Sequence, residues 1–258
     1  MNVEVVLAPN PGPFTGRGTN TWILTSKGSA VVIDPGPVIA AHREATLAAL
    51  AGSDPVAVLV THNHPDHAPA ANDLAGQLGV PAIGPAESAE FSPDRLISDG
   101  EVVVCGAVDL VAVATPGHTS DSTCYRAKNA LFTGDHIMGG STVIVEDMVD
   151  YLESLRRLRG IGITRLYPGH GDVMRDAEAV LGEYLDHRLE REAQILRAIG
   201  GGAGTVGEVV HTVYRDVDPI LHPAAALSVD AHLRKLAADG SVTYAGAGGW
   251  DALVSRAP

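Results

Sequence analysis

The sequence predicts an α/β sandwich followed by a small, mostly helical C-terminal unit. Strand-like and helix-like segments are mixed over the first two thirds of the chain, with several connections of hairpin length, and this order favours a sandwich over a single parallel sheet. From residue 177 onward the pattern changes to helix, helix and a short hairpin. We therefore predict two domains, residues 1–176 and residues 177–258.

Short β-rich runs bounded by Gly and Pro predict the strands of the sandwich. The expected strands are Val3–Ala8, Asn20–Thr25, Ala30–Ile33, Val56–Val60, Glu101–Val104, Asp109–Ala114, Thr123–Arg126, Ala130–Phe132 and Arg165–Tyr167. Helices are expected where helix-forming residues place their charges on one side. These helices are Ala40–Ala51, Ala70–Leu78 and Tyr151–Arg159.

The C-terminal segment has the order of elements found in a winged helix. Its expected elements are a long helix Ala177–Ile199 that ends at three glycines, helices Val206–Tyr214 and Ala224–Ala238, and strands Val242–Tyr244 and Ala252–Val254. Helix Ala224–Ala238 contains Arg234 and Lys235 but also Asp230, so it has no basic stripe. A helix that reads a DNA groove needs such a stripe. We therefore expect no DNA binding.

Composition indicates a globular protein outside the membrane. The chain has 258 residues, 45% hydrophobic and 19% charged, and no apolar run approaches the roughly 20 residues of a membrane span. The N-terminus does not resemble a secretory signal, and Cys105 and Cys124 are too few for a disulfide framework, so we expect buried thiols and a cytoplasmic location. The net charge of −13 argues against a protein whose main function is to bind the phosphate backbone of a nucleic acid.

A cluster of metal-capable side chains follows the apolar run Val56–Val60. Residues 61–67 read Thr-His-Asn-His-Pro-Asp-His, which places His62, His64, Asp66 and His67 within six positions. Pro65 favours extended backbone at His64, so the segment is expected to be a loop. Imidazole and carboxylate ligands together suit Zn²⁺, and the absence of nearby thiolate argues against a purely structural zinc finger.

Three further candidates share one context, because each follows an expected strand and lies in a turn that contains glycine. They are His118, Asp135 and His170. Loops at strand ends are where sheet proteins assemble their sites. Together with the cluster, these residues make seven candidate ligands from four segments.

The order His-x-His-x-Asp-His, then His, Asp and His, resembles the metallo-β-lactamase superfamily. That resemblance implies an αββα sandwich with two zinc ions at one edge. It further implies that His62, His64 and His118 bind one ion, that Asp66, His67 and His170 bind the other, and that Asp135 bridges them.

A narrower resemblance covers nearly the whole chain. The segments Asn10–Thr15 and Gly18–Thr21, the helix segment His187–Glu192 and the winged-helix-like tail are similar to the β-lactamase-like protein 2 subgroup. Animal members of that subgroup are single-strand-specific endoribonucleases, and related fungal proteins are thioesterases. The resemblance thus leaves both chemistries open.

The favoured hypothesis is a zinc-dependent hydrolase of a small ester, thioester or lactone, which uses a hydroxide held between two zinc ions. Asp66 could also receive or relay a proton, so it is the candidate catalytic residue. A small-molecule substrate is favoured over RNA because of the acidic charge. The alternatives are a single-strand-specific endoribonuclease and a non-catalytic zinc-binding module.

Several residues near these candidates are expected to have supporting roles. Asp34 ends a strand near the ligand loops and could hydrogen bond a ligating histidine. His136 is expected to pack or to support a ligand rather than to bind metal itself. His187 and Arg188 could pack the long helix or contact substrate, and packing is favoured. The remaining histidines have no partner at ligand spacing and are expected to be ordinary; they are His42, His211, His222 and His232.

Overall fold

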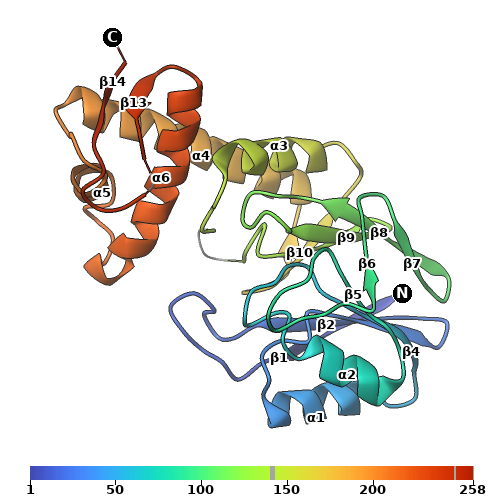
Figure 1. Ribbon diagram of the computed structural model, residues 1–258. Coiled ribbons are helices and arrows are strands. Elements are labelled where there is room, and N and C mark those ends of the chain that lie inside the picture. Colours follow the sequence, from blue (N-terminus) through green and yellow to red (C-terminus); the bar gives the residue numbers. More distant parts are fainter. Residues whose placement is uncertain (140–142, 247, 258) are drawn as a thin grey trace. The chain divides into compact units, whose positions relative to one another are not determined.

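The structure is a computed structural model, and it describes residues 1–139, 143–246 and 248–257 (Figure 1). The chain forms two compact units that are each discontinuous in sequence. The first unit comprises residues 1–115, 121–143 and 159–180, and the second comprises residues 116–120, 144–158 and 181–258. The division after residue 176 stays a prediction.

The first unit contains two six-stranded sheets. The first sheet has the order β1-β2-β3-β4-β5-β6. Its strands are β1 (Asn2–Leu7), β2 (Asn20–Ser26), β3 (Ser29–Ile33), β4 (Asp54–Leu59), β5 (Ala82–Gly84) and β6 (Arg95–Leu96). The pairs β1–β2 and β2–β3 are antiparallel, and the pairs from β3 to β6 are parallel.

The second sheet has the order β12-β11-β10-β9-β8-β7. Its strands are β7 (Val102–Cys105), β8 (Val108–Ala114), β9 (Thr123–Ala127), β10 (Ala130–Gly134), β11 (Arg165–Pro168) and β12 (Met174–Arg175). All neighbours are antiparallel except β10 and β11, whose parallel pairing brings the ends of these two strands together.

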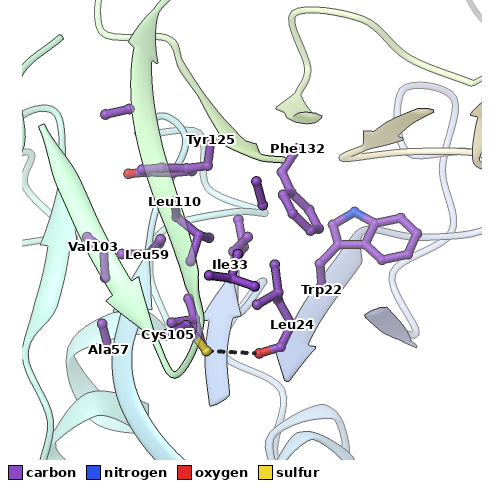
Figure 2. Close-up of a cluster of buried hydrophobic side chains, with 14 of the residues drawn as sticks. Trp22, Leu24, Ile33, Ala57, Leu59, Val103, Cys105, Leu110, Tyr125 and Phe132 are labelled. Atoms are coloured by element: carbon purple, nitrogen blue, oxygen red, sulfur yellow. Dashed lines mark hydrogen bonds between the residues drawn. The ribbon is translucent and has the colours of Figure 1, made fainter. Parts of the chain in front are cut away.

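Apolar side chains from both sheets form one buried core between them (Figure 2). Trp22, Leu24 and Leu59 come from the first sheet, and Leu110 and Phe132 come from the second. Every one of these side chains is less than 5% exposed. The two sheets therefore pack face to face, as the alternation along their strands requires.

Two helices cover the other face of the first sheet (Figure 1). They are α1 (Ala40–Ala49) and α2 (Ala71–Leu78). Leu74 of α2 is buried in one cluster with Val32 and Val58, whose strands β3 and β4 send alternate side chains to this face. The first unit thus has the helix and sheet layers of a sandwich.

The second unit holds α-helices, a short 3₁₀ helix, a hairpin and part of the central chain. Its elements are α3 (Met148–Leu158), most of α4 (Ala177–Gly200), α5 (Val206–Val213), the 3₁₀ helix η1 (Pro219–Leu221), α6 (His222–Ala238), β13 (Val242–Tyr244) and β14 (Val254–Arg256). Thr205 caps the N-terminus of α5, because its hydroxyl accepts a hydrogen bond from the Glu208 amide. Side chains from α4, α5, α6 and the hairpin share one core.

Most predicted elements are present with ends that differ by one or two residues. The sequence did not predict β5, β6 and β12, which are only two or three residues long and therefore carry little alternation. The last strand was expected at Ala252–Val254, but pairing with β13 begins at Val254. No helix in the described part of the chain is long and apolar enough to cross a membrane.

Candidate metal centre

All seven predicted ligands lie in loops that directly follow strands. The loop after β4 carries four of them, and the loops after β8, β10 and β11 carry one each. The loops after β10 and β11 are joined because the Gly169 amide donates a hydrogen bond to the Gly134 carbonyl. Strand pairing in the second sheet therefore brings together Asp135 and His170, which are 35 positions apart in the sequence.

The described residues contain two groups of side chains that could each hold a metal ion. One group comprises His62, His64, His118 and Asp135, and the other comprises Asp66, His67 and His170. In each group, one ligand atom per residue lies within 4.8 Å of the others. Of the seven residues, only His118 belongs to the second unit.

The second group is a tight convergence of nitrogen and oxygen atoms. The Nε2 atoms of His67 and His170 lie 3.3 Å apart. Asp66 Oδ2 lies 3.4 Å from the first of these nitrogens and 3.1 Å from the second. Asp135 also approaches both of them, through Oδ1 at 3.4 Å and Oδ2 at 3.3 Å, so this carboxylate contacts the second group while it belongs to the first.

Hydrogen bonds on the far side of each ring fix which nitrogen carries the proton. His67 Nδ1 lies 2.9 Å from Asp34 Oδ2, and His170 Nδ1 lies 3.2 Å from the Gly18 carbonyl oxygen. Both partners only accept hydrogen bonds, so in the neutral form of each ring Nδ1 is the donor and Nε2 presents a lone pair. Two lone pairs and two carboxylates that face one another repel unless positive charge, from protons or from a metal ion, lies among them. The donor set therefore fits a metal ion.

The same argument applies to the first group. The Thr61 hydroxyl donates to Asp34 Oδ2 at 2.8 Å, so it accepts from His62 Nδ1 at 3.0 Å. His62 Nε2 then lies 3.0 Å from His64 Nδ1 with its lone pair directed toward that atom. His118 Nδ1 donates to the Ile144 carbonyl oxygen at 2.7 Å, which leaves its Nε2 as the candidate ligand atom.

The pKa values of His67 and His170 indicate that the second group favours positive charge. Burial alone would lower the pKa of His67, but the Asp135 and Asp34 carboxylates outweigh it and raise that pKa well above its ordinary value. For His170, burial is likewise outweighed by hydrogen bonds to Asp135 and Asp66, and the pKa rises to about 9. Burial would raise the pKa values of Asp66 and Asp135, but these histidines lower both.

A glycine beside the ligands leaves room for them. A Cβ atom at Gly169 would lie 2.5 Å from Asp135 Oδ1 and 2.6 Å from His67 Cε1. Any side chain there would displace two candidate ligands.

The sequence pattern of the metallo-beta-lactamase superfamily matches residues 14–170, which include all seven predicted ligands. The chain belongs to the metallo-β-lactamase superfamily. A second pattern, the beta-lactamase associated winged helix domain, matches residues 205–250. Together these matches confirm the predicted fold class.

Relatives within the superfamily cover nearly the whole chain. A Beta-lactamase-like protein 2 homolog of Caenorhabditis elegans is 34% identical over 253 residues, which are 93% of this chain and 85% of that protein. An Atrochrysone carboxyl ACP thioesterase of Aspergillus chevalieri is 35% identical over 262 residues, 95% of this chain and 83% of that protein. The predicted resemblance to the β-lactamase-like protein 2 subgroup is thus confirmed.

Solved structures show the same superfamily fold. A metallo-beta-lactamase family protein from Thermus thermophilus has a TM-score of 0.80 at 21% identity and covers 98% of both chains. A Beta-lactamase domain protein from Burkholderia ambifaria has a TM-score of 0.82 at 21% identity, with 99% of this chain and 91% of that chain covered.

Several supporting residues were predicted correctly for this superfamily site. Asp34 is buried and hydrogen bonds the ring of the candidate ligand His67, as expected. His136 is buried and belongs to neither metal-capable group. Arg188 is also buried, and its guanidinium carbon lies 5.2 Å from the centre of the Tyr151 ring, so it packs as expected.

The N-terminal segment has a role at the site that its residue types alone did not predict. The Thr19 hydroxyl donates to Asp66 Oδ2 at 2.8 Å and accepts from Asn10 Nδ2 at 3.0 Å. Asn20 Nδ2 donates to the Pro168 and Gly171 carbonyls at either side of His170. The signal was present in the resemblance of residues 10–21 to the subgroup, but the partners of these side chains are distant in sequence.

Proposed function

We propose that this protein is a dinuclear zinc hydrolase that cleaves an acyl thioester or a related small ester or lactone. His62, His64 and His118 would bind one ion, Asp66, His67 and His170 would bind the other, and Asp135 would contact both. The observation that carries the proposal is the convergence of imidazole lone pairs and carboxylate oxygens in two adjacent groups. Imidazole and carboxylate ligands without thiolate suit zinc at a catalytic site.

When bound, zinc would supply a water acidic enough to act as a nucleophile at neutral pH and would polarise the carbonyl oxygen of the substrate. The chain itself would hold each ligating histidine in one tautomer and would accept the proton that the attacking water loses. Asp34 and the Gly18 carbonyl fix the tautomer, because they accept the Nδ1 protons of His67 and His170.

Asp66 is our candidate for the residue that accepts the proton. Its side chain is 24% exposed, whereas those of His67, His170 and Asp135 are at most 9% exposed, so it is the member of this cluster that solvent reaches most readily. Its lowered pKa keeps it ionised at neutral pH, and the Thr19 hydroxyl holds one of its oxygens. An ionised, fixed carboxylate can accept a proton from an attacking water.

The substrate class rests on two facts. Relatives that are 34% and 35% identical over more than 90% of this chain are named as thioesterases. The net charge of −13 disfavours a polyanionic substrate, because binding one requires local positive charge. We therefore favour a thioester over RNA.

A screen of metal-loaded protein tests this proposal. It compares an acyl thioester, a p-nitrophenyl ester, bis-p-nitrophenyl phosphate and a labelled single-stranded RNA. We expect the thioester to have the highest kcat/KM, and Asp66→Asn to lower kcat at least about 100-fold without unfolding the chain. Asp73→Asn, at an exposed ion pair with Arg43, is the matched control and should be neutral. Preferential RNA cleavage, or no turnover at all, would refute the proposed substrate class.

We also propose that the protein works in a reducing compartment such as the cytoplasm. Cys105 and Cys124 are both free and buried, and burial raises the pKa of Cys124 to about 12. Thiols in this state neither form disulfides nor react readily. Recovery of the native protein from an extracellular fraction would contradict this location.

A further inference from the structure

The second unit contains an unexpected piece of the central chain, residues Pro116–Ser120, which we term the His118 loop. Within this unit, the loop is held by the segment that leads into α3. His118 Nδ1 donates to the Ile144 carbonyl at 2.7 Å, and the Glu146 and Asp147 amides donate to the Gly117 carbonyl at 2.7 and 3.0 Å. The orientation of the His118 ring therefore depends on where residues 144–147 lie.

Helix α3 holds the loop from a second side. The Ser154 hydroxyl donates to the Pro116 carbonyl at 2.9 Å. Gly117 has a φ of +132° and packs against the Tyr151 backbone, where a Cβ atom would lie 2.4 Å from the Tyr151 Cα. The buried guanidinium of Arg188 on α4 lies over the ring of the same tyrosine.

Residues 144–147 are in turn attached to the winged helix. Arg234 on α6 donates from Nη2 to the Glu146 carbonyl oxygen at 2.5 Å and from Nε to Asp230 Oδ2 at 2.9 Å. The Tyr244 hydroxyl, on the first strand of the hairpin, donates to the other oxygen of Asp230 at 2.5 Å. A continuous chain of hydrogen bonds thus runs from the hairpin through Asp230 and Arg234 to the segment that holds His118.

We propose that the C-terminal winged helix positions the candidate ligand His118, and that Arg234 is the residue that connects α6 to the His118 loop. This inference rests on the proposed metal centre. It assigns Arg234 a role within the protein, because Nε and Nη2 both donate to groups of the second unit. Groups that orient a ligating histidine commonly change metal affinity or activity 10- to 100-fold when they are removed.

Metal titration tests the inference without any measurement of activity. Metal-free wild type, Arg234→Ala, Arg234→Lys and His118→Ala are titrated with Zn²⁺ against a chromophoric chelator, and with Co²⁺ followed by its visible absorption. Arg256→Ala is the matched control, because Arg256 also donates to a backbone carbonyl in the second unit, that of Leu196, away from the His118 loop. We expect Arg234→Ala to weaken the binding of one of the two ions about tenfold. Arg234→Lys should recover part of that affinity, and Arg256→Ala should bind both ions as wild type does.

Hydrogen exchange gives a second readout. The amides of Glu146 and Asp147, which bond the Gly117 carbonyl, should exchange faster in Arg234→Ala than in Arg256→Ala. If Arg234→Ala does not fold, Arg234→Lys and Tyr244→Phe provide milder versions of the same test, with smaller effects of the same sign.

The outcomes separate the two proposals. If His118→Ala weakens the binding of one ion but Arg234→Ala and Arg256→Ala have equal metal affinities, the positioning role of Arg234 is wrong and the proposed metal centre stands. If His118→Ala leaves both affinities unchanged, His118 is not a ligand and both proposals about it are overturned.

Discussion

The Nδ1 atom of His67 lies 2.9 Å from Oδ2 of Asp34, and both side chains are almost completely buried. Asp34 also accepts hydrogen bonds from the amide and the hydroxyl of Thr61, each at 2.8 Å. One buried carboxylate therefore orients His67 directly and His62 through the Thr61 hydroxyl. Each of these histidines belongs to a different metal-capable group, so Asp34 supports both.

Replacing Asp34 with asparagine should weaken metal binding at both groups by about 10- to 100-fold. An asparagine tolerates the positive φ of 53° at this position, so the backbone should persist. The asparagine side chain, however, has one acceptor oxygen instead of two, so its NH2 group would face at least one of the three donors and could not accept from it. Competition with a chromophoric chelator measures the loss. Asp172→Asn, at an exposed ion pair with Arg17, is the control, and equal affinities for the two variants would contradict the role of Asp34.

The purified protein should hold two zinc ions per chain after zinc loading, and a chelator should remove them together with activity. The reason is that the described residues contain two groups of imidazole and carboxylate side chains that could each hold an ion. Elemental analysis measures the stoichiometry. A single ion, or none, after loading would rule out the dinuclear centre.

Stability of the metal-free protein should fall as the pH rises from about 6.5 to about 9. The folded-state pKa of His170 is raised to about 9, and its ordinary value is 6.5. The protonated ring therefore contributes stability that is complete below the ordinary pKa and is lost as the pH passes the raised one. Urea denaturation at several pH values measures this change.

Zinc-loaded protein is the comparison for this pH series. Because the metal takes the place of the proton between His67, His170 and the two carboxylates, its stability should change less over the same range. A metal-free protein whose stability does not depend on pH in this window would show that the histidines carry no extra proton.

Salt dependence should distinguish the two substrate classes. Cleavage of RNA would require contacts to phosphates and should decrease steeply as the salt concentration rises. Hydrolysis of a neutral thioester should respond weakly, since screening acts on interactions between charges. Initial rates at about 50 and about 200 mM salt measure the difference. RNA cleavage that is efficient at the higher concentration and is lost in Asp66→Asn would favour the nuclease instead.

Local patterns in the sequence were enough to identify the side chains that could bind metal. Four of them lie within six positions after an apolar strand, and His118, Asp135 and His170 each follow a strand in a glycine-containing turn. Such signals are local, because strand and turn patterns depend on neighbouring residues. The order of the C-terminal elements was local in the same sense, and it predicted the winged helix.

The way in which those candidate ligands are held depends on contacts between distant parts of the chain. The proton positions on His67, His170 and His118 depend on Asp34, Gly18 and Ile144, which lie 33, 152 and 26 residues away in the chain. Two of those partners are backbone carbonyls, and every residue presents the same carbonyl whatever its side chain, so no residue type could reveal them. The assignment of the His118 loop to the second unit likewise came from packing between distant segments, which local patterns do not contain.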